Sequence, residues 1–278
     1  MPTIARRTFL AAGSVGLIGG AVAGRAEGTT RAARGFDGKE DPIDRVPAET
    51  VAEFVGVCHF NVERVGAMLA VEPGLAKSAW DWGFGDWETG IGAASHTGRV
   101  EIVEMLMAHG ARPDVFTLAM LDRVDAVRDV LENIPAMGSI EGPHSISLYR
   151  HAQAGRAERV KEYLASIGLD DTTNPFQTDK TLGDTLGGAY SIAPNDADGR
   201  PGASIIVAWS ERFACLTLTP PGGTSRNLMP IEPGVRSAPG ERAFRPAGSR
   251  GARIVFPDER SLRVEYNGTV TAAVRVVD

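Results

Sequence analysis

Apolar positions recur with a helical period in four eight-residue segments of the first half of the chain. In each segment they fall at i, i+3, i+6 and i+7, which lie on one face of a helix. An acidic residue follows the first position, where it favours a helix N-terminus through the helix dipole. The segments are 62–69, 100–107, 124–131 and 157–164. They predict four helices that bury their central valines, Val65, Val103, Val127 and Val160.

After residue 170 the pattern changes to short β-branched or apolar runs separated by turn residues. Asn267-Gly268, between the last two runs, is the strongest hairpin signal in the chain. The regular spacing of the runs predicts an antiparallel meander that closes into a small barrel or sandwich. The predicted strands are 189–192, 204–209, 214–219, 228–231, 242–245, 253–256, 261–266 and 270–277.

The helical segments repeat, with 38, 24 and 33 residues between successive central valines. Residues 89–99, which lead to a His109-Gly110-Ala111 exit, resemble an ankyrin repeat, although the Thr-Pro-Leu-His of that family is absent. Gly98 is expected to take a positive φ at the turn, and Asp122 and Gly155 occupy the equivalent positions. The resemblance implies an ankyrin-like α-solenoid of about four degenerate repeats.

The C-terminal part carries a second, shorter resemblance. Residues 188–190, 244–248 and 253–256 are similar to a lipocalin-like domain found at the C-terminus of some exported bacterial proteins. Together the two resemblances predict an α+β multidomain chain, in which the solenoid precedes an antiparallel β-barrel or sandwich.

The N-terminus is typical of an export signal. Arg6-Arg7 precede an apolar run that ends in an A-x-A-like site after Ala23. The arginine pair resembles the twin-arginine signal, which implies folding in the cytoplasm before release to the periplasm or beyond. The run is too short to span a bilayer, so we expect no stable membrane insertion after cleavage. The predicted divisions are a signal peptide (1–23), a disordered linker (24–47), the repeat domain (48–170), a connector (171–187) and the β domain (188–278).

The composition limits the classes of function. A chain of 278 residues with 43% hydrophobic and 23% charged residues is typical of a globular protein. Its net charge of −6 argues against nucleic-acid binding, which needs a basic surface. The two cysteines, Cys58 and Cys215, are far apart and favour buried thiols, with an interdomain disulfide as the alternative.

A search for local catalytic motifs finds none. The five histidines show no His-Glu-x-x-His spacing, so no metal or other cofactor is predicted, and His96 and His151 are expected to hydrogen-bond between repeats. No Gly-x-Ser-x-Gly or Ser-x-x-Lys motif indicates a serine hydrolase. Residues 195–199 resemble part of a calcium loop but lack the flanking carboxylates, which favours a hairpin turn.

Three of the four tryptophans lie within residues 80–88, interleaved with Asp81, Asp86 and Glu88. In an ankyrin stack this loop would line the concave face, and aromatic residues are enriched in binding hot spots. The segment is therefore predicted either as a binding site, whose acids select a cationic or hydroxyl-rich group, or as a packed insertion between repeats. The candidate partner-binding residues are Trp80, Trp82, Phe84, Asp86 and Trp87.

The function predicted from sequence is that of an exported, non-enzymatic protein that binds a protein or peptide partner. One alternative is a β-barrel carrier of a small apolar ligand, in a cavity lined by Tyr190, Trp209 and Phe256. The other is a hydrolase with an unrecognised site, which paired titratable groups in a cleft between the domains would indicate.

Overall fold

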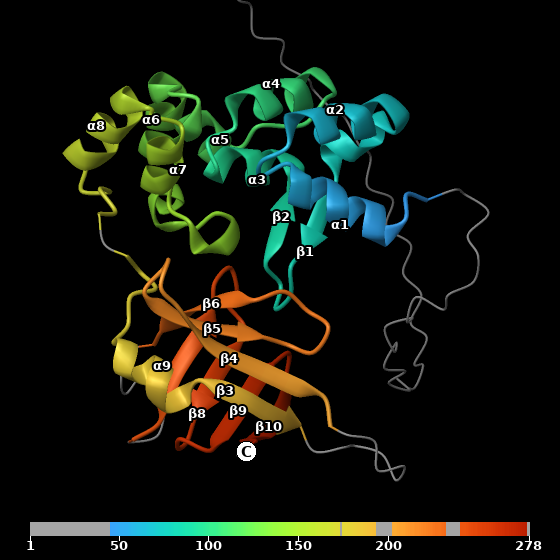
Figure 1. Ribbon diagram of the computed structural model, residues 1–278. Helices are drawn as coiled ribbons and strands as arrows, with labels where there is room; N and C mark the ends of the chain where they lie inside the picture. The colour runs from blue at the N-terminus through green and yellow to red at the C-terminus, as the bar shows by residue number, and fades with distance from the viewer. Residues whose placement is uncertain (1–44, 173, 193–201, 232–239, 277–278) are drawn as a thin grey trace, which may run out of the picture. The chain divides into compact units, whose positions relative to one another are not determined.

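The computed structural model describes residues 45–172, 174–192, 202–231 and 240–276 (Figure 1). The predicted signal peptide, nearly all of the linker and residues 195–199 lie outside these ranges. All helices and strands described below belong to one compact unit, Val46–Asp278. Among the described helices, none has the length and apolar character needed to cross a membrane.

Eight helices form four consecutive pairs within residues 48–166, and this stretch with its connecting segments is termed the helical part below (Figure 1). They are α1 (Ala48–Val57), α2 (Val62–Val71), α3 (Gly90–His96), α4 (Val100–Ala108), α5 (Val115–Met120), α6 (Val124–Asn133), α7 (Leu148–Ala154) and α8 (Glu158–Ser166). The predicted segments coincide with α2, α4, α6 and α8, and their four central valines are fully buried. The helical interpretation of the segments is therefore confirmed.

The turns within the pairs use positive φ at small or polar residues. Gly98 has φ 69° between α3 and α4, and Asp122 has φ 57° between α5 and α6, as predicted. Between α7 and α8 the prediction was wrong by one residue, because Arg156 takes φ 55° while Gly155 has φ −80°. Gly155 is needed for close packing instead, since a Cβ there would overlap the carbonyl oxygen of Met120.

Eight antiparallel strands form a closed barrel in which each strand pairs with the next and the last pairs with the first. They are β3 (Gly188–Ile192), β4 (Ser204–Ser210), β5 (Cys215–Thr219), β6 (Arg226–Pro230), β7 (Arg242–Pro246), β8 (Arg253–Phe256), β9 (Ser261–Tyr266) and β10 (Thr269–Arg275). All eight strand predictions are confirmed, and the barrel replaces the sandwich alternative. Asn267 and Gly268 both have positive φ, as a two-residue hairpin turn requires.

Apolar side chains from all eight strands form the core of the barrel. Tyr190 and Phe256 are fully buried and meet edge to face, and Trp209 packs against the same cluster. The residues predicted to line a ligand cavity therefore pack into the barrel core.

Several elements were not predicted. Strands β1 (Ala79–Asp81) and β2 (Trp87–Thr89) form a hairpin between α2 and α3. Helix α9 (Lys180–Leu186) lies within the predicted connector, and the buried Leu186 joins the barrel core. Short 3₁₀ helices occur at η1 (Pro73–Lys77), η2 (Pro135–Ser139) and η3 (Pro143–Ser145). Each of them begins at a proline, whose fixed φ suits a first helical turn.

Candidate metal centre

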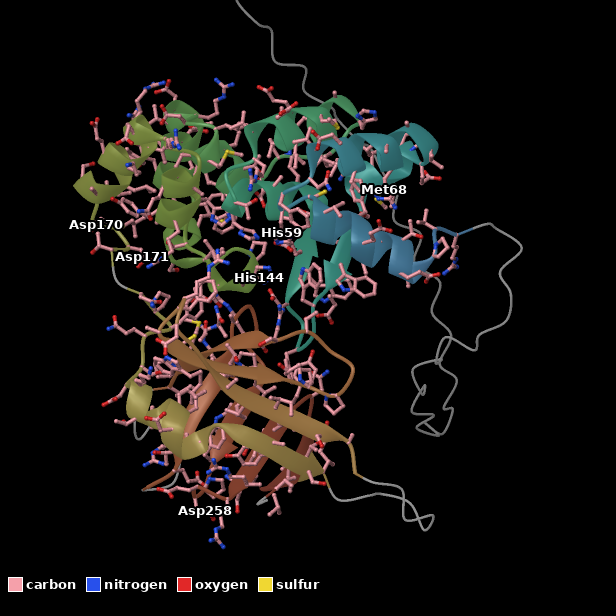
Figure 2. All side chains as sticks on the ribbon, in the orientation of Figure 1. His59, Met68, His144, Asp170, Asp171 and Asp258 are labelled. Carbon is pink, nitrogen blue, oxygen red and sulfur yellow. The ribbon has the colours of Figure 1, made fainter. Side chains whose placement is uncertain are left out.

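Three histidines and one glutamate from four separate segments converge in the helical part. Each of them offers one ligand atom, and these four atoms all lie within 4.8 Å of one another. His59 follows α1, Glu88 lies in β2, His96 ends α3 and His144 lies in η3 (Figure 2 labels His59 and His144). We call these four residues the His₃Glu cluster.

Glu88 lies at the centre of the cluster. Its Oε1 atom is 2.9 Å from Nε2 of His96 and 3.4 Å from Nε2 of His144. Its Oε2 atom is 3.4 Å from Nε2 of His59 and accepts a 2.7 Å hydrogen bond from Nε1 of Trp82. All three imidazoles therefore present the same nitrogen, Nε2, to one carboxylate.

The other ring nitrogen is held by an acceptor in two of the histidines. Nδ1 of His59 lies 3.0 Å from the carbonyl oxygen of Gly56, at the end of α1. Nδ1 of His144 lies 2.6 Å from Oδ2 of Asp86, whose Oδ1 accepts the His144 backbone N–H at 3.0 Å. In a neutral imidazole such an acceptor favours the proton on Nδ1, so that Nε2 would be the nitrogen that binds a metal ion, as is usual for metal-ligating histidines.

The carboxylate of Glu88 is buried, with 0% of its side chain exposed. Burial raises the pKa of Glu88, but hydrogen bonds and positive charge from His144 and His96 outweigh it and hold the pKa well below its ordinary value. For His144, burial lowers the pKa, while hydrogen bonds to Asp86 and Glu88 prevail and raise it to about 9. Without a metal the cluster is thus a buried anion stabilised by a protonated imidazole.

Barrel residues hold the second carboxylate of the site, Asp86. Its Oδ2 atom accepts from the guanidinium of Arg226, at the start of β6, and both side chains are buried. Gly248, after β7, packs so closely on Asp86 that a Cβ there would overlap the carboxylate. Asp86 therefore links the barrel to His144.

The η3 segment is fixed to the barrel by further hydrogen bonds. Ser145 Oγ accepts from the backbone N–H of Gly248 at 2.9 Å and from Nη1 of Arg245 at 3.0 Å. Nη2 of Arg245 donates to both carboxylate oxygens of Glu141, at 2.8 and 3.1 Å. His144 and Ser145 both have positive φ, 57° and 60°, a conformation that costs free energy and that these contacts maintain. The barrel thus helps to position one of the candidate ligands.

The His₃Glu cluster opens on one side to a cavity of about 750 Å³. His59, His96 and His144 line this cavity, and their side chains are 22%, 9% and 23% exposed. Glu88 lies behind them. A small molecule in the cavity can therefore reach the imidazoles, while the carboxylate stays shielded from water.

The five residues predicted for partner binding have different surroundings. Trp80 and Trp82 are partly buried against the helical core, Phe84 packs against the barrel core, Asp86 is buried and Trp87 is 63% exposed. Asp86 and Trp82 contact the His₃Glu cluster, so the structure places these two beside a candidate metal site. Trp87 is the exposed member of the set, and partner binding by this segment stays a prediction.

No local spacing predicts the cluster, because its members lie far apart in sequence. His96, expected to bond between repeats, contacts Glu88, and Nδ1 of His151 contacts the carbonyl oxygen of Ser147, the N-cap of its own helix. The prediction of free, buried cysteines is confirmed. Burial, with the charge of Glu88, raises the pKa of Cys58 to about 12, so this neighbouring residue stays a thiol.

No family model, curated protein or solved structure matches the chain. The geometry of the site is therefore what supports a function.

Proposed function

We propose that the His₃Glu cluster binds a divalent transition-metal ion. The observation that carries this proposal is the convergence of four ligand atoms within 4.8 Å. Around a zinc ion, ligand atoms at about 2.0–2.2 Å are roughly 3.4 Å from one another, so modest side-chain adjustment closes the site. Imidazole nitrogens with one carboxylate suit zinc, iron and neighbouring ions of the first transition row.

The hydrogen bonds around the cluster support a cation at its centre. Because Nδ1 of His59 faces a carbonyl oxygen, its Nε2 is an acceptor in the neutral imidazole. That atom faces an oxygen of Glu88 at 3.4 Å, and two acceptors repel each other unless a proton or a metal ion lies between them. His144 has the same arrangement, so a metal ion would replace protons at these positions.

The opening to the cavity favours a catalytic role, and we propose hydrolysis of a small molecule. With four protein ligands, this role needs a fifth coordination position on the cavity side, where an ion would lower the pKa of bound water and polarise a substrate oxygen. In such a step water adds to the substrate, the bond to the leaving group breaks and the leaving group takes the released proton. This corresponds to the hydrolase alternative, because the titratable groups lie beside a cavity lined by both the helical part and the barrel.

Metal titration tests the binding proposal. Protein stripped with a chelator is titrated with Zn²⁺ by calorimetry and with Co²⁺ by visible absorption. We expect one ion per chain, and His96→Ala and Glu88→Gln should each weaken binding by about 100-fold or more. His109→Ala is the matched control, because His109 is exposed at the end of α4. A folded wild-type protein that binds no ion would contradict the proposal.

Hydrolysis is tested separately with 4-nitrophenyl carboxylic esters, phosphates and sulfates. Turnover should require the metal, disappear on chelation and return when the ion is restored. Glu88→Gln should remove it, while His109→Ala should not. If the metal-loaded protein acts on none of these classes, the hydrolytic role is wrong although the metal site stands.

A second candidate function is partner binding by the helical part, which we propose to be an ankyrin-like solenoid beside a lipocalin-like barrel. The paired helices, their buried valines and the turns at Gly98 and Asp122 support the solenoid. The exposed Trp87 in β2 supports a contact surface. Trp87→Ala should weaken capture of a periplasmic partner without altering stability, whereas unchanged capture would remove Trp87 from the surface.

The predicted export signal indicates where in the cell the metal ion would be bound. We propose that the chain follows the twin-arginine route, whose cargo folds before export. The four ligands come from segments between His59 and His144, so the cluster is complete only in the folded chain. Metal loading would then take place in the cytoplasm, and fractionation with metal analysis of the cytoplasmic form tests this order.

A further inference from the structure

The cavity beside the His₃Glu cluster is lined by basic side chains. Besides three histidines, its lining includes Arg99, Arg212 and Arg226, and among the described residues no aspartate or glutamate lines it. The chain as a whole is acidic, with a net charge of −6. A cavity with this lining attracts anions, because low-dielectric walls strengthen the field of fixed charges.

Two of the three arginines have guanidinium groups available for a ligand. Nε of Arg99 donates to the carbonyl oxygen of His59 at 3.1 Å, and the Arg212 guanidinium lies 5.0 Å from the ring centroid of Phe213. Among the described residues, neither of them forms an ion pair with a carboxylate. Arg226 forms an ion pair with Asp86. Its buried Nε atom has no hydrogen-bond partner among the residues that the structure describes.

We propose that this cavity binds a small organic oxyanion, a carboxylate or a phosphate. The inference rests on the proposed metal centre: one oxygen of the anion would bind the ion at a fifth position on the cavity side, and the others would accept hydrogen bonds from Arg99 and Arg212. Guanidinium groups suit both kinds of oxyanion because their planar N–H groups match two oxygens at once. In the hydrolytic role, the substrate class is therefore an anionic ester.

The aromatic residues of the cavity indicate the organic part of the ligand. Phe60 and Phe213 line it and are exposed, which leaves apolar surface beside the arginines. The volume of about 750 Å³ lies within the range usual for small-molecule sites. An apolar group on the anion would cover these rings.

A neighbouring cavity of about 690 Å³ shares Arg212 and Phe213 but is less suited to an anion. Its lining includes Asp171, which pairs with Arg150 at 2.9 Å. Of the cluster histidines, only His96 reaches it. The cavity that holds all three histidines is therefore the one assigned to the oxyanion.

Calorimetry with defined probes tests the inference. Zinc-loaded protein is titrated with inorganic phosphate and with benzoate, and with benzamide as the uncharged counterpart of benzoate. We expect saturable binding of at least one anion and none of benzamide. Arg212→Gln and Arg99→Gln should each weaken anion binding about tenfold or more, the range of a charge-assisted hydrogen bond. Arg128→Gln is the control, since Arg128 lies on α6 and outside the cavity lining.

The outcomes separate this inference from the metal proposal. Co²⁺ absorption and zinc affinity are measured on the same variants, and both should equal the wild type in Arg212→Gln and Arg99→Gln. If zinc binds but neither anion does, or if both arginine variants bind anions as well as the wild type, the inference is overturned. Equal anion affinity with and without zinc would overturn the metal–oxygen contact. Failure of zinc itself to bind would instead refute the metal centre.

Discussion

The helical part and the barrel bury different kinds of side chain. The central barrel cluster is apolar, and its one hydroxyl, on Tyr190, donates to the Leu186 carbonyl oxygen. The helical part buries two carboxylates, Asp86 and Glu88, and the imidazole of His151. Because burying a charge costs several kcal/mol unless it is paired, this concentration of buried charge marks the part that carries the chemistry. The barrel supports that site by supplying Arg226.

The largest effect is expected for a substitution in the barrel core. Phe256→Ala removes a buried ring that contacts both Tyr190 and Phe244, and should lower the free energy of unfolding by about 3–5 kcal/mol. Urea denaturation followed by circular dichroism measures this loss. Zinc affinity of the folded fraction should stay the same. A large fall in zinc affinity in a folded variant would show that the barrel interior belongs to the site.

The contact between the two parts is tested at Arg226. Arg226→Met leaves the buried carboxylate of Asp86 without its guanidinium, and should lower the free energy of unfolding by about 3 kcal/mol. Arg128→Met is the matched control, because the Arg128–Asp125 pair is exposed and should contribute less than about 1 kcal/mol. Equal losses in the two variants, measured by urea denaturation, would contradict the structural role given to the buried pair.

Acid should destabilise the metal-free protein through His151. Burial lowers its pKa to about 4, below the value of about 6.5 in an unfolded chain. Below pH 6.5 the unfolded state then binds more protons than the folded state. The contribution of His151 to the free energy of unfolding is therefore present at neutral pH and is lost as the pH falls towards 4. Between pH 7 and pH 4.5 this loss amounts to about 2 kcal/mol. Urea denaturation of His151→Leu should show a correspondingly shallower loss, whereas an identical pH dependence would refute the assignment.

The smallest effect concerns the two tryptophans of the hairpin. Trp82→Phe removes the 2.7 Å hydrogen bond to Glu88 and should weaken zinc binding about tenfold, as loss of a group that orients a metal ligand does. Trp87→Phe makes the same change at an exposed ring and should leave zinc affinity unaltered. Calorimetry on the two variants compares them directly. If both lose affinity equally, the hairpin acts as a whole rather than through Trp82.

Local signals explain why the fold was largely predictable. Strand alternation and turn residues such as Asn267-Gly268 act over a few neighbours, so all eight barrel strands could be located. The valine-centred segments likewise locate four helices. Helix α9 was missed because its sequence, KTLGDTL, is polar and contains a glycine. The β1–β2 hairpin was missed because each of its strands is three residues long, too short for an alternating pattern to distinguish it from a loop.

The site was predictable only in part. His59, His96 and His144 are brought together by tertiary packing, which no local spacing records. The acidic character of the tryptophan segment predicts that Asp81, Asp86 and Glu88 select a cationic or hydroxyl-rich group of a ligand, and this stays a prediction. In the structure, Asp86 and Glu88 instead contact histidines and Arg226 of the same chain. These partners lie far away in sequence, so only the fold identifies them.

Anomalous diffraction from crystals of the zinc-loaded protein, recorded on both sides of the zinc absorption edge, tests the metal centre most directly. We predict one strong peak per chain, within coordination distance of Nε2 of His59, His96 and His144 and of a Glu88 oxygen. Crystals without a peak there, from protein shown by calorimetry to be saturated with zinc, would contradict this account.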